Sequence, residues 1–429
     1  MTAGAWRGGW RQGLGYGALG GPLAFVALPL YVILPNHYAS AFGVPLATLG
    51  VLLLGARLLD ALADPWIGRL ADRWFAQSAR RVLVRMAVAA GVLALGFRAL
   101  FFPPAWALGH LLWWCGVVLA LTYLAYSVLS VAHQAWGARL GGDDGQRARI
   151  VSWREGLALA GVLLASVLPS LAGLSTSTIV FGGLLGLGLG LLWRAPRPDS
   201  VRRPDTAATA AGASAAGPWQ SIHFRRLLAV YLINGVASAV PATLVLFFIR
   251  DRLQAPAFEP GFLACYFAAG ALSMPLWVRA VARLGLARAW LAGMLLAVAT
   301  FCGAATLGAG DVAAFMIVCL ASGIALGADL SLPAALLAGV IQRAGHGGRL
   351  EGAYFGWWHF ATKLNLALAA GLSLPLLAAL GYEPGSRSGE GLRALSLAYC
   401  LLPCLLKLFA AALLHFWTDA PHGTEPSPA

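Results

Sequence analysis

Residues 46–81 have the sequence LATLGVLLLGARLLDALADPWIGRLADRWFAQSARR. The segment 46–67 is apolar enough and long enough to form a helix that crosses a membrane. The segment that follows is basic and contains Arg69, Arg73, Arg80 and Arg81. A spanning helix that ends in a basic loop is typical of a membrane protein whose loop lies in the cytoplasm.

The composition of the whole chain agrees with this reading. Of its 429 residues, 59% are hydrophobic and only 11% are charged, and the mean hydropathy is +0.75. A soluble domain has roughly 45 to 50% apolar and about 25% charged residues. The sequence therefore predicts an all-α integral membrane protein with about twelve transmembrane helices, because each span needs about 20 residues.

Apolar runs of spanning length occur in two sets of six, separated by a polar tract rich in Ala, Gly, Ser and Thr. They lie at 14–38, 46–67, 82–102, 105–131, 151–171, 178–193, 227–248, 261–281, 290–307, 312–337, 353–377 and 395–417. The tract is too polar to span a membrane and too low in complexity to pack. We therefore expect a six-helix half at 1–194, a cytoplasmic linker at 195–226, a second six-helix half at 227–417 and a cytoplasmic tail at 418–429.

The positive charges give the orientation. The net charge is +13, but the arginines form short clusters between apolar runs, so nucleic-acid binding is not expected. When the loops are assigned to alternate sides, 22 of the 30 Lys and Arg residues fall on one side. By the positive-inside rule, both termini and the linker are predicted to be cytoplasmic, in a bacterial-type inner membrane.

The chain offers little for catalysis. Its six cysteines all lie inside apolar runs without the spacing of metal ligands, so we expect neither a disulfide nor a metal site. It contains no Walker A loop, no HExxH and no GxSxG. The chain is therefore predicted not to be an enzyme and to have no cofactor.

A few charged residues lie at membrane depth, where each is costly and needs an explanation. The acids are Asp60, Asp64 and Asp329, and the bases are Arg57 and Lys363. The i, i+3, i+7 spacing of Arg57, Asp60 and Asp64 places all three on one helix face. Lys363 requires a carboxylate from another helix, and we expect this to be Asp60 or Asp64.

Two further deep residues have open assignments. Asp329 precedes Pro333 and could form a second cation site or pair with Lys363. Lys407 lies in the last span, where its long stem could reach the interface, and a structural role is favoured for it.

The segment 55–68, GARLLDALADPWIG, resembles the second helix of the glycoside-pentoside-hexuronide:cation symporters. This is the melibiose permease group of the major facilitator superfamily. The resemblance implies the major facilitator fold and a coupling-cation site formed by Asp60 and Asp64, with Arg57 and Lys363 nearby. Sodium-using members carry an asparagine between the two aspartates, where this chain has Ala63. Because Na⁺ needs oxygen ligands and a proton does not, coupling to H⁺ is favoured over Na⁺.

The same resemblance extends to the cytoplasmic loops. The pattern Gly68-x-Leu70-x-Asp72-Arg73 is similar to the loop motif that the superfamily uses as a charged latch in alternating access. Arg147, just before the fifth span, and Arg154, within it, add to this resemblance. The latch residues predicted for gating are therefore Gly68, Asp72, Arg73, Arg147 and Arg154.

The solute-binding residues are expected to be neutral or aromatic. Gly21-Pro22 and Ser127 occupy the positions where melibiose permease has its sugar-binding carboxylates, so galactoside recognition is not expected. Aromatic faces beside neutral hydrogen-bonding groups suit a sugar-like or amphipathic solute. The candidate contacts are Tyr126, Ser127, Gln134, Trp357, His359 and Asp329.

The sequence thus favours a monomeric secondary transporter that carries a small, sugar-like organic solute in symport with protons. Its expected partners are the solute, the coupling cation and the lipid bilayer. Two alternatives remain open: a carrier of lysolipids or other amphipathic solutes, and a sugar symporter coupled to Na⁺.

Overall fold

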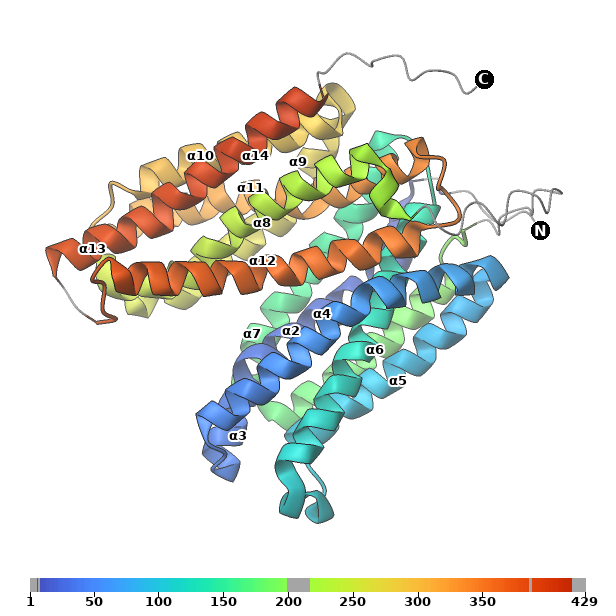
Figure 1. Cartoon of the computed structure of the whole chain (residues 1–429), viewed down its shortest axis with the longest axis horizontal. Coiled ribbons are helices and arrows are strands. Elements are labelled where there is room, and N and C mark those ends of the chain that lie inside the picture. Colours follow the sequence, from blue (N-terminus) through green and yellow to red (C-terminus); the bar gives the residue numbers. More distant parts are fainter. Residues whose placement is uncertain (1–5, 7, 199–216, 386–387, 419–429) are drawn as a thin grey trace. The chain divides into compact units, whose positions relative to one another are not determined.

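The computed structural model describes residues 6, 8–198, 217–385 and 388–418, and every regular element within these ranges is a helix (Figure 1). The first half of the chain contains α1 (Trp10–Gly17), α2 (Gly20–Leu28), η1 (Pro29–Ile33), α3 (Leu34–Phe42), α4 (Leu46–Gln77), α5 (Ala79–Phe101), η2 (Ala105–His110), α6 (Leu111–Arg139) and α7 (Asp144–Arg194). The second contains η3 (Pro218–Gln220), α8 (Ile222–Phe247), η4 (Phe248–Arg252), η5 (Pro256–Phe258), α9 (Glu259–Leu284), α10 (Leu286–Ala304), α11 (Val312–Arg343), α12 (Glu351–Ala379), α13 (Gly389–Ser396), η6 (Leu397–Leu401) and α14 (Leu402–Thr418).

The predicted all-helical membrane architecture is confirmed. Within the described ranges, ten helices are long and apolar enough to cross a membrane, with α7 counted once. The 32-residue α4 adds the span predicted at 46–67, in which charges interrupt the apolar run. The second arm of α7 adds another, which brings the number to the expected twelve.

Element α7 contains the two spans predicted at 151–171 and 178–193 as two helical arms on either side of Gly173. It has 51 residues and would be about 76 Å long if straight, against about 30 Å for the apolar core of a bilayer. The helix kinks at Gly173, where φ is +79° and ψ is 166°. A residue with a side chain rarely adopts this conformation, so glycine allows the chain to turn there.

The helices form two compact units. The first comprises residues 1–220 together with 337–360, and the second comprises 221–336 together with 361–429. The first unit therefore includes the end of α11 and the start of α12. The linker boundaries at 195 and 226 stay a prediction, because 199–216 lie outside the described residues.

Aromatic side chains fill the core of each unit. In the first unit, the Phe181 ring lies 4.9 Å from that of Phe97 and 5.9 Å from that of Phe25. In the second, Phe248 stacks on Tyr399 with 4.3 Å between ring centroids, and α14 packs against both α8 and α10 (Figure 1). Such ring pairs add stabilisation beyond the area they bury.

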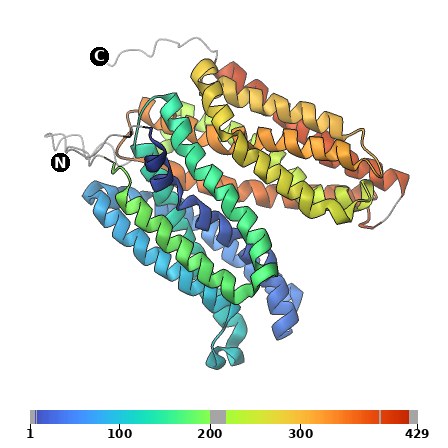
Figure 2. The same cartoon turned by 180° about the vertical axis from the view of Figure 1, so that it is seen from behind.

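Helices α1 and α2 lie against α7, as the view from behind shows (Figure 2), and small residues allow the close approach. A Cβ atom on Gly161 would lie 2.0 Å from the carbonyl oxygen of Gly21, and one on Gly188 would lie 2.9 Å from the Cα of Leu19. Close contact through small residues is the usual way in which helices associate in a membrane, where burial of apolar surface gives little drive.

We expect Gly161→Ala to destabilise the protein by about 1 to 3 kcal/mol, because the added methyl group has no space between α2 and α7. The matched control is Gly183→Ala on the same helix, where a Cβ would meet nothing within 4 Å. Thermal unfolding followed by tryptophan fluorescence compares the two variants. Equal melting temperatures would contradict the close packing of α2 on α7.

Candidate transport site

Helix α4 carries two buried carboxylates within the span predicted at 46–67. Asp60 is 3% exposed and Asp64 is 0% exposed. The Ser127 hydroxyl on α6 donates a hydrogen bond to Asp60 Oδ1 over 2.7 Å. The start of α12 passes close by, since a Cβ on Gly356 would lie 2.5 Å from the carbonyl oxygen of Asp64.

An arginine and three tyrosines lie beside these carboxylates. The Arg57 guanidinium lies over the Tyr31 ring, 3.9 Å from its centroid, which is a favourable cation–π contact. The Tyr31 ring is in turn 6.1 Å from that of Tyr123. Tyr126 is half-buried one turn further along α6. The first unit therefore combines acids, one base and aromatic hydroxyl groups around α4 and α6.

Two other predicted solute contacts meet near the start of α12. The Nε2 atoms of Gln134 on α6 and His359 on α12 lie 2.7 Å apart, which is hydrogen-bonding distance. Trp357 packs edge-to-face on Trp219, with 4.9 Å between ring centroids. Lys363 belongs to the second unit, so its expected contact with Asp60 or Asp64 stays a prediction.

The predicted latch contains a buried charge network. Asp72 on α4 accepts hydrogen bonds from the backbone amides of Gly352, over 2.7 Å, and Ala353, over 2.8 Å. These amides belong to the first turn of α12, which carries a partial positive charge and favours an anion. At the same crossing, a Cβ on Gly68 would lie 2.1 Å from the carbonyl oxygen of Gly352. Asp72 thus holds the end of α4 to the start of α12.

Two members of this network were missed by the sequence analysis. Arg139 at the end of α6 lies 2.8 Å from Asp72 Oδ1 and 3.0 Å from Glu351 Oε2. Arg139 also donates to the carbonyl oxygen of Gly348 and lies over the Phe75 ring. The side chains of Arg139 and Glu351 are 4% and 0% exposed. The signal that could have found Glu351 is an acid two residues before the span predicted at 353–377; in the structure it is the first residue of α12.

The other arginines predicted for gating lie elsewhere in the first unit. Arg73 is exposed. Arg147 pairs with Asp144 in the first turn of α7, 3.2 Å away. Arg154 is buried and pairs with its neighbour Glu155. A gating role for these three arginines stays a prediction.

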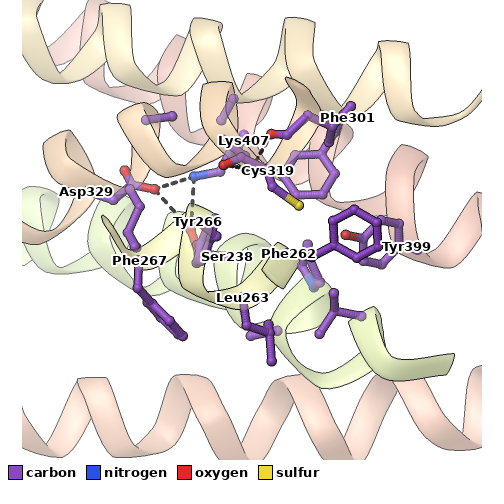
Figure 3. A pocket seen from close by; sticks show the side chains of 18 residues that line it. Ser238, Phe262, Leu263, Tyr266, Phe267, Phe301, Cys319, Asp329, Tyr399 and Lys407 are labelled. Atoms are coloured by element: carbon purple, nitrogen blue, oxygen red, sulfur yellow. Dashed lines mark hydrogen bonds and ion pairs between the residues drawn. The ribbon is translucent and has the colours of Figure 1, made fainter. Parts of the chain in front are cut away.

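The second unit contains a buried ion pair that joins α11 to α14 (Figure 3). Lys407 Nζ lies 2.6 Å from Asp329 Oδ2. It also donates to Asn234 Oδ1 over 2.9 Å and to the Ser238 hydroxyl over 3.0 Å, both on α8. Asp329 accepts three more hydrogen bonds, from Asn234, Ser238 and Trp290.

This pair corrects the assignment of Asp329. The expectation that Asp329 could pair with Lys363 is wrong, because its cation is Lys407. Lys407 is 3% exposed, so its ammonium group does not extend to an interface. All three ammonium donors and both carboxylate oxygens are in use, which is the condition for a buried ion pair to be tolerated. Lys407 therefore balances Asp329 within the second unit.

The described residues contain no group of three or more His, Cys, Asp or Glu side chains placed to hold a metal ion. The acids and bases at depth instead occur in small networks of carboxylates, hydroxyls, arginines and one lysine. A bundle of apolar helices with such internal networks defines a class: a multi-pass membrane transport protein.

The comparison with known families gives the same class. The chain matches the MFS/sugar transport protein family over residues 13–418. It therefore belongs to this family of membrane transporters, which is not a class of enzymes. The predicted resemblance and fold are confirmed.

Two Escherichia coli K12 proteins are similar to parts of the chain. The inner membrane symporter YicJ is 32% identical over 158 residues, which cover 36% of this chain and 33% of YicJ. YagG, whose name gives it provisionally as a glycoside/cation symporter, is 30% identical over 183 residues, which cover 41% of this chain and 39% of YagG. The chain thus matches well under two thirds of the length of either relative.

Solved structures support the fold. A bacterial homologue of the iron transporter ferroportin, in its outward-facing state, superposes with a TM-score of 0.69 at 17% identity, covering 96% of this chain and 100% of that one. The major facilitator transporter FucP, in the outward conformation, gives 0.66 at 16% identity, covering 93% of this chain and 98% of FucP.

The ion pair in the second unit predicts a stability effect. Lys407→Met should destabilise the protein by about 3 to 5 kcal/mol, because Asp329 is left as an uncompensated buried charge. The double variant Lys407→Met with Asp329→Asn should recover much of this loss, since neither partner is then charged. Thermal unfolding of the single and double variants measures both effects.

The control for this prediction is the exposed pair Arg250–Glu259, where Arg250→Met should cost less than about 1 kcal/mol. The single variant Asp329→Asn completes the cycle. If the double variant lost as much stability as Lys407→Met and Asp329→Asn lose separately in sum, Asp329 and Lys407 would not be energetically coupled.

The latch predicts a second stability effect. Asp72→Ala removes the acceptor for two backbone amides and one partner of Arg139, so we expect a loss of about 2 to 4 kcal/mol. Asp72→Asn should lose less, because its amide oxygen can still accept from the start of α12. Asp144→Ala, which breaks the surface pair with Arg147, is the control. Equal effects at Asp72 and Asp144 would contradict the latch geometry.

Proposed function

We propose that this protein is a proton-coupled symporter that carries a small, sugar-like solute by alternating access. The observation that carries the proposal is the burial of Asp60 and Asp64 on one helix at membrane depth. Charged groups in such a place are expensive to maintain and usually serve transport. A carboxylate in a poorly solvated site can take up and release a proton during the cycle.

The choice of the proton rests on the residues between and around the two acids. Position 63, between them, is alanine and offers no side-chain oxygen. A sodium ion would have to be held by oxygen ligands at short distances, whereas a proton needs only the carboxylate itself. Lys407 already balances Asp329, so Asp60 and Asp64 remain for coupling, together with Arg57 and Lys363.

The solute class follows from the family and from the side chains around α4 and α6. The family is described as one of sugar transport, and the name of YagG refers to glycoside/cation symport. The aromatic rings of Tyr31 and Tyr126 can pack on the faces of a sugar ring. Arg57 and the Gln134–His359 pair can hydrogen-bond its hydroxyl groups.

The remaining parts of the proposal concern location and gating. The name of YicJ places that relative in an inner membrane, and we assign this chain to the same compartment, as a monomer with both termini in the cytoplasm. Opening on the cytoplasmic side would require the Asp72–Arg139–Glu351 network to break. Gly68 would set how closely α4 and α12 approach when the network re-forms.

The test is transport by the full chain reconstituted in liposomes on a solid-supported membrane. Jumps of sugars and glycosides should give a transient current that does not need Na⁺ and grows with an inward proton gradient. Asp60→Asn and Asp64→Asn should reduce the current at least tenfold, because neither amide can carry the proton. The matched control Glu390→Gln alters an exposed acid on α13 and should leave the current unchanged.

The outcomes separate the alternatives. A current that requires Na⁺ would contradict proton coupling. A current triggered by lysolipids, with none from any sugar or glycoside, would contradict the sugar-like solute. Full currents in both aspartate variants would show that coupling does not depend on α4.

A further inference from the structure

The second unit contains a partly open cavity of about 140 Å³ between α8, α9, α10, α11 and the last span (Figure 3). Most of its wall is apolar, with Phe262, Phe267 and Phe301 among the rings that line it. Asp329 and Lys407 lie in its wall together with Ser238. The cavity is therefore amphipathic, with an ion pair on one side and aromatic rings on another.

The ion pair contributes an electric field but no free hydrogen-bonding group. The three donors of Lys407 are used by Asn234, Ser238 and Asp329. Asp329 Oδ1 accepts from Asn234 and Trp290, and Oδ2 accepts from Ser238 and Lys407. An anionic or cationic ligand would have to break this network, so a neutral occupant is favoured.

Two tyrosines in the wall have unused hydroxyl groups. Tyr266 on α9 and Tyr399 in η6 both line the cavity, and Tyr399 is only 4% exposed. In the part of the chain that the structure describes, neither hydroxyl forms a hydrogen bond with another protein group. Both hydroxyls can therefore form a hydrogen bond with an occupant that carries a donor or acceptor atom.

The size of the cavity limits the occupant. An apolar protein cavity of about 150 Å³ is large enough to bind benzene. A sugar would fit poorly for a chemical reason, because most of its hydroxyl groups would face aromatic and aliphatic side chains and lose their hydrogen bonds to water. A single aromatic ring with one hydroxyl group matches the volume, the aromatic wall and the two tyrosine hydroxyls.

We propose that this cavity is a binding site for a small neutral phenol. The ring packs among Phe262, Phe267 and Phe301, and the phenol hydroxyl forms hydrogen bonds with Tyr266 and Tyr399. This inference does not rest on the proposed symport, because it concerns binding within the second unit alone.

The test uses 4-fluorophenol and ¹⁹F NMR on the full chain in lipid nanodiscs. The probe should bind saturably and be displaced by unlabelled phenol, with no such signal in empty nanodiscs. Fluorobenzene, which lacks the hydroxyl, should bind about tenfold more weakly, the factor expected for one lost hydrogen bond. Tyr399→Phe should weaken 4-fluorophenol by a similar factor and leave fluorobenzene almost unchanged.

A filled variant and a control complete the experiment. Ala297→Leu on α10 places extra carbon atoms in the cavity and should abolish saturable binding, while its thermal unfolding shows whether it is folded. Leu295→Ile, on an exposed position of the same helix, should bind as the wild type does. Binding that persists in folded Ala297→Leu, or that is absent from the wild type, would overturn the proposal. Equal affinity for 4-fluorophenol and fluorobenzene would also overturn it.

Discussion

The scarcity of charge inside the bilayer governs this molecule. The apolar core of a membrane offers no water, so each backbone group and each ionised side chain must be satisfied by the protein itself. The helices meet the first requirement. The second requires every deep charge to have partners. Asp60 on α4 accepts a hydrogen bond from Ser127 on α6, and Asp329 forms an ion pair with Lys407 in the second unit.

These networks differ in what they can do. Asp329 has a cation and three other donors within one unit, so its charge is stabilised in place and it contributes to the stability of that unit. Asp60 and Asp64 lie one turn apart on a single helix, with Arg57 on the same stretch. In the proposed function, these two acids are the groups that take up and release the coupling proton.

Much of the fold could be predicted because membrane insertion acts on local sequence. A run of about 20 apolar residues is sufficient to predict a span. The i, i+3, i+7 spacing places Arg57, Asp60 and Asp64 on one face of α4; in the structure the two acids are buried, whereas Arg57 is exposed and lies over the Tyr31 ring. The exact position and form of the turn within α7 were harder to predict from the sequence. The sequence predicted separate helices at 151–171 and 178–193, and the chain does turn between them. The turn is the single non-helical residue Gly173 rather than a loop, because a glycine can adopt a positive φ.

The charge partners could not be predicted from spacing, because they come from distant positions. Lys407 forms a hydrogen bond with Asn234, which lies 173 residues away in the sequence. Arg139 on α6 pairs with Asp72 on α4 and with Glu351 on α12. The sequence analysis therefore placed Lys407 in a lone structural role and missed Arg139. A lone charge in an apolar run shows from the sequence that a partner is needed, but which residue serves as the partner depends on how the helices pack.

The central claim is that a carboxylic acid on α4 binds and releases the coupling proton. Infrared difference spectroscopy of the reconstituted protein tests it without knowledge of the solute, by following the carbonyl stretch of protonated carboxylic acids as the pH is raised. The account predicts a band that disappears with rising pH, is insensitive to Na⁺ and is missing from Asp60→Asn or Asp64→Asn. A spectrum without such a band, or a band that Na⁺ removes at constant pH, would contradict it.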